Sequence, residues 1–463
     1  MLYGSRIPEV ILMLLFVSAC ADDSGVSITA SMDETETALL VTRPVRGDRP
    51  VEDRQWFVAD RVPEFGGMRL SNDTVHVMLT DLSARERAEG AIRALLMAPG
   101  GDPRQGGPTH PSIVVHQGSH SFADLSEWRE RLTLSIFSID GVISVAIDYH
   151  NNAILVGVRD DDVVAEVERF LGRIQVPSSA VRFRRDEVRL HVGATSSATW
   201  TGTTLKSQFR PLRGGIVLPR LGDETGSGCT LSFGALWENR EVFLTASHCS
   251  SIFWSTDNQQ YFQHLPIGSA EYYVGIEYYD PRGSSCSVFY KCRWSDASIV
   301  LPASGVAIKR GAIARPSGFG SIVIDPANPE FTIGSSYQWP LQNWNVRMVG
   351  HASGLTQGQI INDCVDVSHN WQIRKCQVVA SYPSANGDSG APVFSPANEG
   401  RVTLYGLHWG HAGGGSVFSP IGGIVRDLGS MFVSVPLTSD PGEPGGPGGC
   451  SEPSDPNGMI EPC

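Results

Sequence analysis

The stretch that decides the fold is Asn386–Phe394, NGDSGAPVF. It holds a serine, Ser389, between an aspartate and a glycine. A nucleophilic serine beside backbone amides fits this pattern, but Gly, Asp, Ser and Pro are also the commonest residues of ordinary turns. A serine becomes a nucleophile only when a base and an orienting carboxylate reach it from elsewhere in the chain. The two interpretations are therefore separated by whether the sequence supplies a suitable histidine and acid.

Two upstream stretches supply these groups. Phe243–Cys249, FLTASHC, ends an apolar run near His248, and Trp294–Val300, WSDASIV, has Asp296 at the edge of an apolar strand. Together with GDSGAP they resemble the three catalytic segments of the chymotrypsin-like serine proteases, in that family's order of His, Asp and Ser. The nucleophile elbow of the α/β-hydrolases fits less well, because it requires glycine where Ala391 stands and places the histidine last.

The resemblance implies a fold and a role for each residue. The fold would be an all-β pair of six-stranded barrels, spanning residues 211–437. Ser389 would attack the scissile carbonyl of a polypeptide substrate, His248 would take and return the proton, and Asp296 would orient the imidazole. The amides of Gly387 and Ser389 would form the oxyanion hole.

Within that family, the closer resemblance is to bacterial enzymes of the α-lytic protease and streptogrisin type. Residues 350–358, GHASGLTQG, resemble their GxTSGxTxG turn, and residues 406–429 resemble their substrate-binding strand and closing segment. This resemblance implies that the substrate-binding residues include His408, Trp409, Gly410 and Ser416.

Residues 73–200 predict a small α+β domain ahead of the barrels. Asn151 and Asn152 between two alternating apolar runs indicate a hairpin, and Asp160 begins an amphipathic helix. The order β-α-β-β-α-β predicts a split βαβ sheet with helices on one face. The unit looks like the pro-region of the same bacterial enzymes, which assists folding and inhibits them; an accessory domain that recognises partners is the alternative. We expect strands at 75–79, 112–118, 141–158 (two strands) and 179–187, and helices at 83–97, 122–137 and 160–174.

The ends of the sequence predict export and a lipid anchor. Residues 1–20 have one arginine and an apolar run too short to span a bilayer, which predicts an export signal. Val17–Cys20, VSAC, resembles the bacterial lipobox, which implies cleavage before Cys20 and a lipid on its thiol; an ordinary signal peptide with a chance cysteine is the alternative. Residues 21–72 predict a flexible tether, and residues 438–463 a Pro/Gly-rich tail.

The predicted location follows from this order. We expect a cell-envelope lipoprotein of the outer membrane or periplasm, made as a zymogen, whose partners are polypeptide substrates, its own pro-domain and the membrane. The anchor would precede the pro-domain, so cleavage between residues 200 and 214 would release the protease unless the two parts stay bound.

Composition and cysteine count agree with an exported enzyme. The net charge of −13 and the lack of a Lys/Arg run argue against nucleic acid as a partner. Setting Cys20 aside leaves eight of the nine cysteines, an even number typical of disulfide proteins. No zinc or redox spacing and no HExxH motif occurs, so we expect no metal and no cofactor. Proximity in the sequence suggests the disulfides Cys229–Cys249, Cys286–Cys292, Cys364–Cys376 and Cys450–Cys463. The resemblance adds that the first of these would hold the loop that carries the histidine.

Specificity is only weakly readable. Pro383 stands six residues before the nucleophile, where trypsin-like enzymes carry aspartate, so an apolar or aromatic residue is expected before the scissile bond rather than Lys or Arg. His408 could assist a negatively charged residue before the scissile bond, but the resemblance favours a hydrogen bond from His408 to Asp296. Arg347 is the candidate internal cation for Asp388. A catalytically silent surface-anchored binding protein with a protease-like barrel is the alternative to an enzyme.

Overall fold

The protein is described from a computed structural model. The described residues are 49–71, 74–97, 111–191, 203–222, 228–263, 267–287 and 289–433. Contacts divide the chain into two units, Met1–Arg43 and Pro44–Cys463, and every described residue belongs to the second. The predicted signal peptide, the lipidation site at Cys20 and the Pro/Gly-rich tail lie outside the described residues. Within the described residues, no helix combines the length and apolar character needed to cross a membrane.

The first elements lie where a tether was predicted, so that prediction is wrong for residues 49–71. Trp56 and Phe65 are buried, and the rings of both pack near Phe122. The helix here has seven residues, too few for an apolar period to stand out in the sequence. The elements are η1 (Pro50–Glu52), α1 (Asp53–Ala59) and β1 (Phe65–Ser71).

The rest of the N-terminal region, residues 74–191, contains the strands and helices that the sequence predicts. Ser121 accepts a hydrogen bond from the Asp124 amide at the start of α3, and Asp160 accepts one from Val163 at the start of α4. Asn152 takes a left-handed conformation, φ 50°, in the hairpin turn. The elements are β2 (Thr74–Leu79), η2 (Leu82–Ala84), α2 (Arg85–Met97), β3 (Ser112–Gln117), α3 (Phe122–Ile136), β4 (Val142–Asp148), β5 (Ala153–Val158), α4 (Asp161–Arg173), η3 (Ser178–Ala180), β6 (Val181–Arg185) and β7 (Arg189–Leu190).

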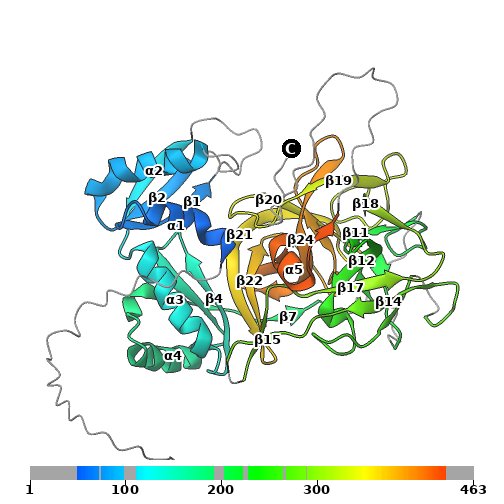
Figure 1. The fold of residues 1–463 in the computed structure, drawn as a ribbon, viewed down its shortest axis with the longest axis horizontal. Helices are drawn as coiled ribbons and strands as arrows, with labels where there is room; N and C mark the ends of the chain where they lie inside the picture. Colours follow the sequence, from blue (N-terminus) through cyan, green and yellow to red (C-terminus); the bar gives the residue numbers. More distant parts are fainter. Residues whose placement is uncertain are drawn as a thin grey trace, which may run out of the picture. The chain divides into compact units, whose positions relative to one another are not determined.

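These strands form two sheets, not the single split βαβ sheet expected. Strands β1, β2 and β3 make a three-stranded sheet in which β2 and β3 are parallel. Strands β4, β5 and β6 belong to a sheet that continues into the C-terminal region, because β4 pairs antiparallel with β21 (Gly354–His369), as Figure 1 shows. The prediction failed because the partner of β4 lies far along the chain, where local patterns cannot point to it.

The C-terminal region, residues 203–433, is rich in strands, and its described residues include the helix α5 (Ile421–Leu428). One sheet has six strands in the order β13-β14-β17-β12-β11-β26. Among the strands of the described residues there is no second, separate six-stranded barrel sheet, because most remaining strands share one fifteen-stranded sheet with β4–β7. The strands are β8 (Leu212–Gly214), β9 (Val217–Leu218), β10 (Cys229–Thr230), β11 (Gly234–Trp237), β12 (Arg240–Ala246), β13 (Gln260–Phe262), β14 (Tyr273–Tyr279), β15 (Ser284–Ser285), β16 (Lys291–Arg293), β17 (Ala297–Pro302), β18 (Ile308–Ala314), β19 (Glu330–Ser336), β20 (Asn345–Gly350), β22 (Gln372–Ala380), β23 (Pro392–Phe394), β24 (Arg401–Ala412), β25 (Gly415–Pro420) and β26 (Met431–Phe432).

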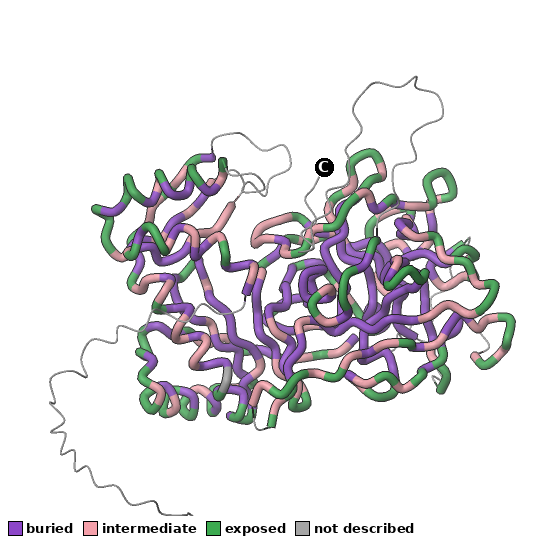
Figure 2. The backbone as a smooth tube through the Cα atoms, viewed as in Figure 1, coloured by how far each residue is buried: buried purple, intermediate pink, exposed green. Residues whose placement is uncertain are grey.

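Each region has an apolar core, and each core includes buried residues of the other region. Phe243 and Trp409 are buried in the C-terminal core, and Val156 in the N-terminal one. Ile373 on β22 and Cys292 beside it join the N-terminal core although they belong to the C-terminal region. Figure 2 shows the buried segments running through the strands, while exposed residues gather in the outer turns.

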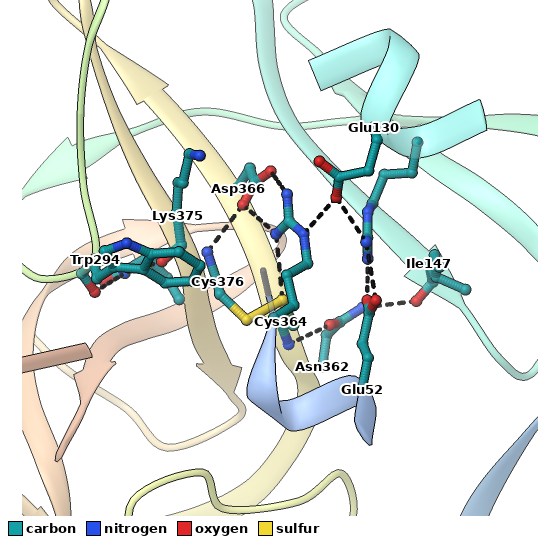
Figure 3. The surroundings of a disulfide bond; sticks show 12 residues. Glu52, Glu130, Ile147, Trp294, Asn362, Cys364, Asp366, Lys375 and Cys376 are labelled. Carbon is teal, nitrogen blue, oxygen red and sulfur yellow. Dashed lines mark hydrogen bonds and ion pairs between the residues drawn. A yellow bond between two sulfur atoms is a disulfide. The ribbon is translucent and has the colours of Figure 1, made fainter. Parts of the chain in front are cut away.

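A buried cluster of charges joins the two regions beside the Cys364–Cys376 disulfide (Figure 3). Arg49 donates both ends of its guanidinium to Asp366 on β21, at 2.7 and 2.6 Å, and its Nε to Glu130 at 2.8 Å. Burial alone would lower the pKa of Arg49, but Asp366 and the neighbouring glutamates raise it well above its usual value. The guanidinium is therefore charged and paired where the regions meet.

The structure joins three of the four cysteine pairs as guessed, Cys229–Cys249, Cys286–Cys292 and Cys364–Cys376. The fourth pair, Cys450–Cys463, lies outside the described residues.

Candidate active site

Three side chains from separate segments meet in the C-terminal region. His248 lies in the 3₁₀ turn η4 (Ser247–Cys249), Asp296 precedes β17, and Ser389 lies between β22 and β23. Because β12 and β17 pair antiparallel, the end of one and the start of the other bring His248 and Asp296 together. His248 Nδ1 is 2.5 Å from Asp296 Oδ2, and Nε2 is 2.7 Å from Ser389 Oγ. This chain of contacts lets a hydroxyl pass its proton to an imidazole held by a carboxylate.

Backbone hydrogen bonds fix the turn that carries Ser389. The Thr230 amide donates to the Ser389 carbonyl at 2.7 Å, and the Gly390 amide donates to the His408 carbonyl at 2.8 Å. Gly390 has φ 91°, and a Cβ there would lie 2.1 Å from the Thr230 carbonyl oxygen, so only glycine fits. The Cys229–Cys249 disulfide links β10, which contains Thr230, to the turn that carries His248.

The amide of Gly387 faces a carbonyl of the chain itself. Gly387 has φ 101°, a conformation that residues with side chains rarely adopt. Its N–H donates to the carbonyl oxygen of His191 at 2.6 Å. The Ser389 amide, the second expected oxyanion donor, makes no hydrogen bond to the carbonyl oxygen of His191. One of the two expected donors therefore holds a peptide carbonyl at the site.

Residues 189–191 lie along β24 as an added antiparallel strand. Leu190 is opposite Gly410. The His191 amide donates to the Trp409 carbonyl at 3.4 Å, and Ser389 Oγ lies 3.0 Å from the same carbonyl oxygen. Extended peptides bind a sheet edge in this manner, with backbone hydrogen bonds along the strand and side chains in alternate pockets. The chain thus presents its own residues 189–191 as a substrate would be presented.

Asp186 attaches this segment to the turn between β24 and β25. Its Oδ2 accepts hydrogen bonds from Ser144 Oγ at 2.6 Å and from the Gly413 amide at 2.9 Å. No motif in the sequence signals this placement, because β7 has two residues and its partner strand lies in the other region. The placement of residues 189–191 along β24 is therefore a finding that only the structure supplies.

His408 contacts the His191 side chain. Its Nε2 lies 3.1 Å from His191 Nδ1, and its Nδ1 lies 3.0 Å from the Tyr382 hydroxyl. The prediction that His408 bonds to Asp296 is wrong. Burial and then the neighbouring histidines lower the pKa of His408 well below its usual value, and lower the pKa of His191 to about 4. Both rings are therefore neutral near pH 7. Ser416 donates to the Tyr382 carbonyl at 2.6 Å and so shapes the same pocket.

Asp296 is held by residues that no sequence motif singles out. Its Oδ1 accepts from Arg374 Nη2 at 3.0 Å and from Trp254 Nε1 at 3.3 Å. Its amide donates to Ser419 Oγ at 2.8 Å. Burial would raise the pKa of Asp296, but Arg374 and then His248 outweigh burial and bring it below the usual range. The carboxylate is therefore charged.

Asp388 does not pair with Arg347, so that prediction is wrong. Arg347 donates to Gln357 at 3.0 Å and lies over the ring of Phe319. Burial raises the pKa of Asp388, and hydrogen bonds from backbone amides oppose this rise. The amides that donate to the Asp388 carboxylate are those of Ala352, Ser353 and Ala385, at 3.1, 3.0 and 2.8 Å.

Nothing in the chemistry of the three-residue cluster calls for a metal, because hydroxyl, imidazole and carboxylate suffice for acyl transfer. In the described ranges, no group of three or more His, Cys, Asp or Glu side chains is arranged to hold one.

Solved structures resemble this chain, whereas no protein-family model and no curated protein matches it. One is a glutamic-acid-specific serine protease described as using a novel histidine triad in substrate binding: identity is 19%, TM-score 0.35, with 48% of this chain and 100% of that chain covered. A Nocardiopsis protease is 17% identical, with TM-score 0.34 and coverages of 48% and 98%. Cellulomonas bogoriensis chymotrypsin is 17% identical, with TM-score 0.33 and coverages of 49% and 98%. Each of these three matches covers about half of this chain and nearly all of the other chain.

Proposed function

We propose that this protein is a serine endopeptidase made as a zymogen, in which the N-terminal region acts as an inhibitory pro-domain. One observation carries the proposal: a serine–histidine–aspartate chain of hydrogen bonds stands beside an amide, that of Gly387, which already holds a peptide carbonyl. A binding protein without activity has no need of this arrangement.

In the proposed reaction, Ser389 Oγ attacks the carbonyl carbon of the scissile bond while His248 Nε2 takes its proton. The Gly387 amide stabilises the negative charge on the carbonyl oxygen, and Asp296 stabilises the imidazolium. His248 then gives the proton to the leaving amine, which leaves an acyl group on Ser389. Water, deprotonated by His248, releases the acid and restores the serine.

The inhibitory role is supported by residues 189–191, which fill the cleft of their own chain. The carbonyl at the Gly387 amide belongs to His191, so the bond in register for cleavage is His191–Val192. This bond lies just ahead of the 200–214 segment where cleavage was expected. The charge cluster around Arg49 and the β4–β21 pairing would keep the two regions together after cleavage.

The residue before the scissile bond is proposed to be a polar one that reaches His408. His408 Nε2 contacts the imidazole of His191, and the Tyr382 hydroxyl fixes the other ring nitrogen. A buried hydrogen-bonding group left without a partner costs about 1–3 kcal/mol, so an apolar side chain would be disfavoured here. Histidine, glutamine and glutamate have the required length and polar atoms. This replaces the apolar preference expected from sequence.

Export and a lipid on Cys20 are proposed on the sequence of residues 1–20. With the anchor on the N-terminal side, a protease that stays bound to its pro-domain would remain at the membrane. Fractionation of cells that produce the processed chain tests this, because a soluble C-terminal region would contradict retention.

A fluorophosphonate probe tests the proposed function. The C-terminal region of the processed wild type, separated from the N-terminal region, is expected to label at Ser389, and the Ser389→Ala variant is expected neither to label nor to be cleaved. The amino-terminal sequence of the processed C-terminal fragment is expected to begin at Val192 or at a residue trimmed later. Absence of labelling in a processed, folded wild type would favour a silent binding protein.

A further inference from the structure

Arg374 is the least expected residue beside the proposed catalytic groups. Its guanidinium is completely buried and donates through Nη2 to Asp296 Oδ1 at 3.0 Å, while the other oxygen of that carboxylate contacts His248. It lies between two indole rings, with Cζ 5.2 Å from the Trp254 centroid and 4.9 Å from that of Trp409. A cation held on two aromatic faces and one carboxylate is fixed in position.

The remaining charges around this carboxylate are already matched. Arg293, the other nearby guanidinium, pairs with Asp280 at 2.6 Å and with Asp427 at 3.3 Å. In the described part of the chain, Asp296 is the carboxylate within ion-pair distance of Arg374. The charge of Arg374 is therefore directed at the residue that orients the histidine. The other titratable side chains around the Asp296–His248 pair are the imidazoles of His369, His408 and His191.

We propose that Arg374 is a positioning residue of the reaction, which fixes the rotation of the Asp296 carboxylate and offsets part of its charge. A fully uncompensated carboxylate would hold a proton on the imidazole more strongly. The guanidinium holds one oxygen of the carboxylate, and the other oxygen is then directed at His248 Nδ1. The inference rests on the proposed peptidase function.

The stacking on Trp409 gives Arg374 a second connection to the cleft. The Trp409 carbonyl oxygen lies 3.0 Å from Ser389 Oγ and accepts a hydrogen bond from the substrate-like His191 amide. The Trp409 ring is also held by the hydrogen bond that its Nε1 donates to Gln377 at 2.9 Å. Arg374 thus contacts both the acid of the cluster and the residue along which the peptide lies.

The test compares the pH dependence of kcat/KM for a peptide substrate in the processed wild type, Arg374→Met and Arg374→Lys. Removing the cation is expected to move the acid limb to higher pH by about one unit or more, because an opposite or like charge at this range shifts a titration by about 1–3 units. KM is expected to stay near the wild-type value. Arg374→Lys is expected to keep the acid limb close to its wild-type position, since it keeps the charge.

Trp254→Phe is the matched control, because it removes the other donor to Asp296 Oδ1 and keeps the guanidinium. It is expected to leave the acid limb in place. An unmoved limb in a folded Arg374→Met variant, or an equal shift in Trp254→Phe, overturns the inference. If Arg374→Met does not fold, Arg374→Lys decides: a limb within half a unit of wild type supports the inference, and a limb displaced as far as about one unit contradicts it. A wild type that fails to label with fluorophosphonate would instead reject the proposed function.

Discussion

Two buried arginine–aspartate pairs use opposite strands of the β21–β22 hairpin. Asp366 on β21 accepts two hydrogen bonds from Arg49 and one from the Cys376 amide, so both its oxygens are matched by one region-to-region contact. Arg374 on β22 gives Asp296 a single Nη2 contact, and its Nε and Nη1 have no hydrogen-bond partner among the described residues. The Arg49–Asp366 pair, in which both carboxylate oxygens are bonded to the arginine, suits a contact that holds the two regions together. The Arg374–Asp296 pair leaves the second carboxylate oxygen for His248.

Substitution of the two aspartates is therefore expected to have different effects on kcat. Asp296→Asn should lower kcat by about 10⁴-fold, as in other serine–histidine–aspartate triads, because the imidazole loses its required tautomer. Asp366→Asn should leave kcat unchanged once the N-terminal region has been removed. Steady-state kinetics on the processed proteins measures both. A large loss of kcat in Asp366→Asn would mean that the attachment and the site are not separable.

The attachment itself can be broken at its arginine. Arg49→Met leaves Asp366 buried and unpaired, and removing one partner of a buried pair costs about 3–5 kcal/mol, so the regions should dissociate about a hundredfold or more readily after cleavage. The measurement is the activity that appears when the processed chain is diluted.

Two variants bracket that result. Arg49→Met with Asp366→Leu should recover most of the association, because a buried ion pair replaced by apolar groups is often neutral. Arg185→Met, which removes an exposed pair with Asp161, should change little. Equal behaviour of Arg49→Met and Arg185→Met would show that the Arg49 pair does not hold the regions together.

The smallest expected effect is a pH dependence of cleft occupancy. The pKa of His191 is about 4 when residues 189–191 lie in the site, below its ordinary value. Protonation of His191 therefore favours the released segment over the bound one. Occupancy should be greatest above about pH 6.5 and should weaken by up to about tenfold per pH unit as the pH falls toward 4. The groups facing His191 are His408, His411, His248 and Arg189.

A His191→Gln variant isolates the contribution of His191 protonation, because glutamine keeps a polar side chain that does not titrate. The ratio of wild-type to variant activity on dilution, followed from pH 7 to pH 5, should rise as the solution becomes more acidic. A ratio that stays constant would assign the pH dependence to the other histidines of the cleft.

Local chemistry explains what could be predicted. The caps at Ser121 and Asp160 and the Asn152 turn act within a few residues, so the elements of the N-terminal region are readable along the chain. The segments around His248, Asp296 and Ser389 are readable because together, in this order, they resemble the three catalytic segments of a known protease family. The structure brings these three side chains within hydrogen-bonding distance.

The sequence by itself determined the elements and the reactive side chains, since both depend on neighbours in the chain. Only the tertiary structure decided that β4 extends a sheet of the other region, that His191 occupies the cleft, and that Arg49 and Arg374 pair with distant aspartates. These contacts join residues widely separated in sequence, and an arginine looks the same along the chain whether it will be solvated or buried against a carboxylate. Their energies depend on burial, which exists only once the chain has folded.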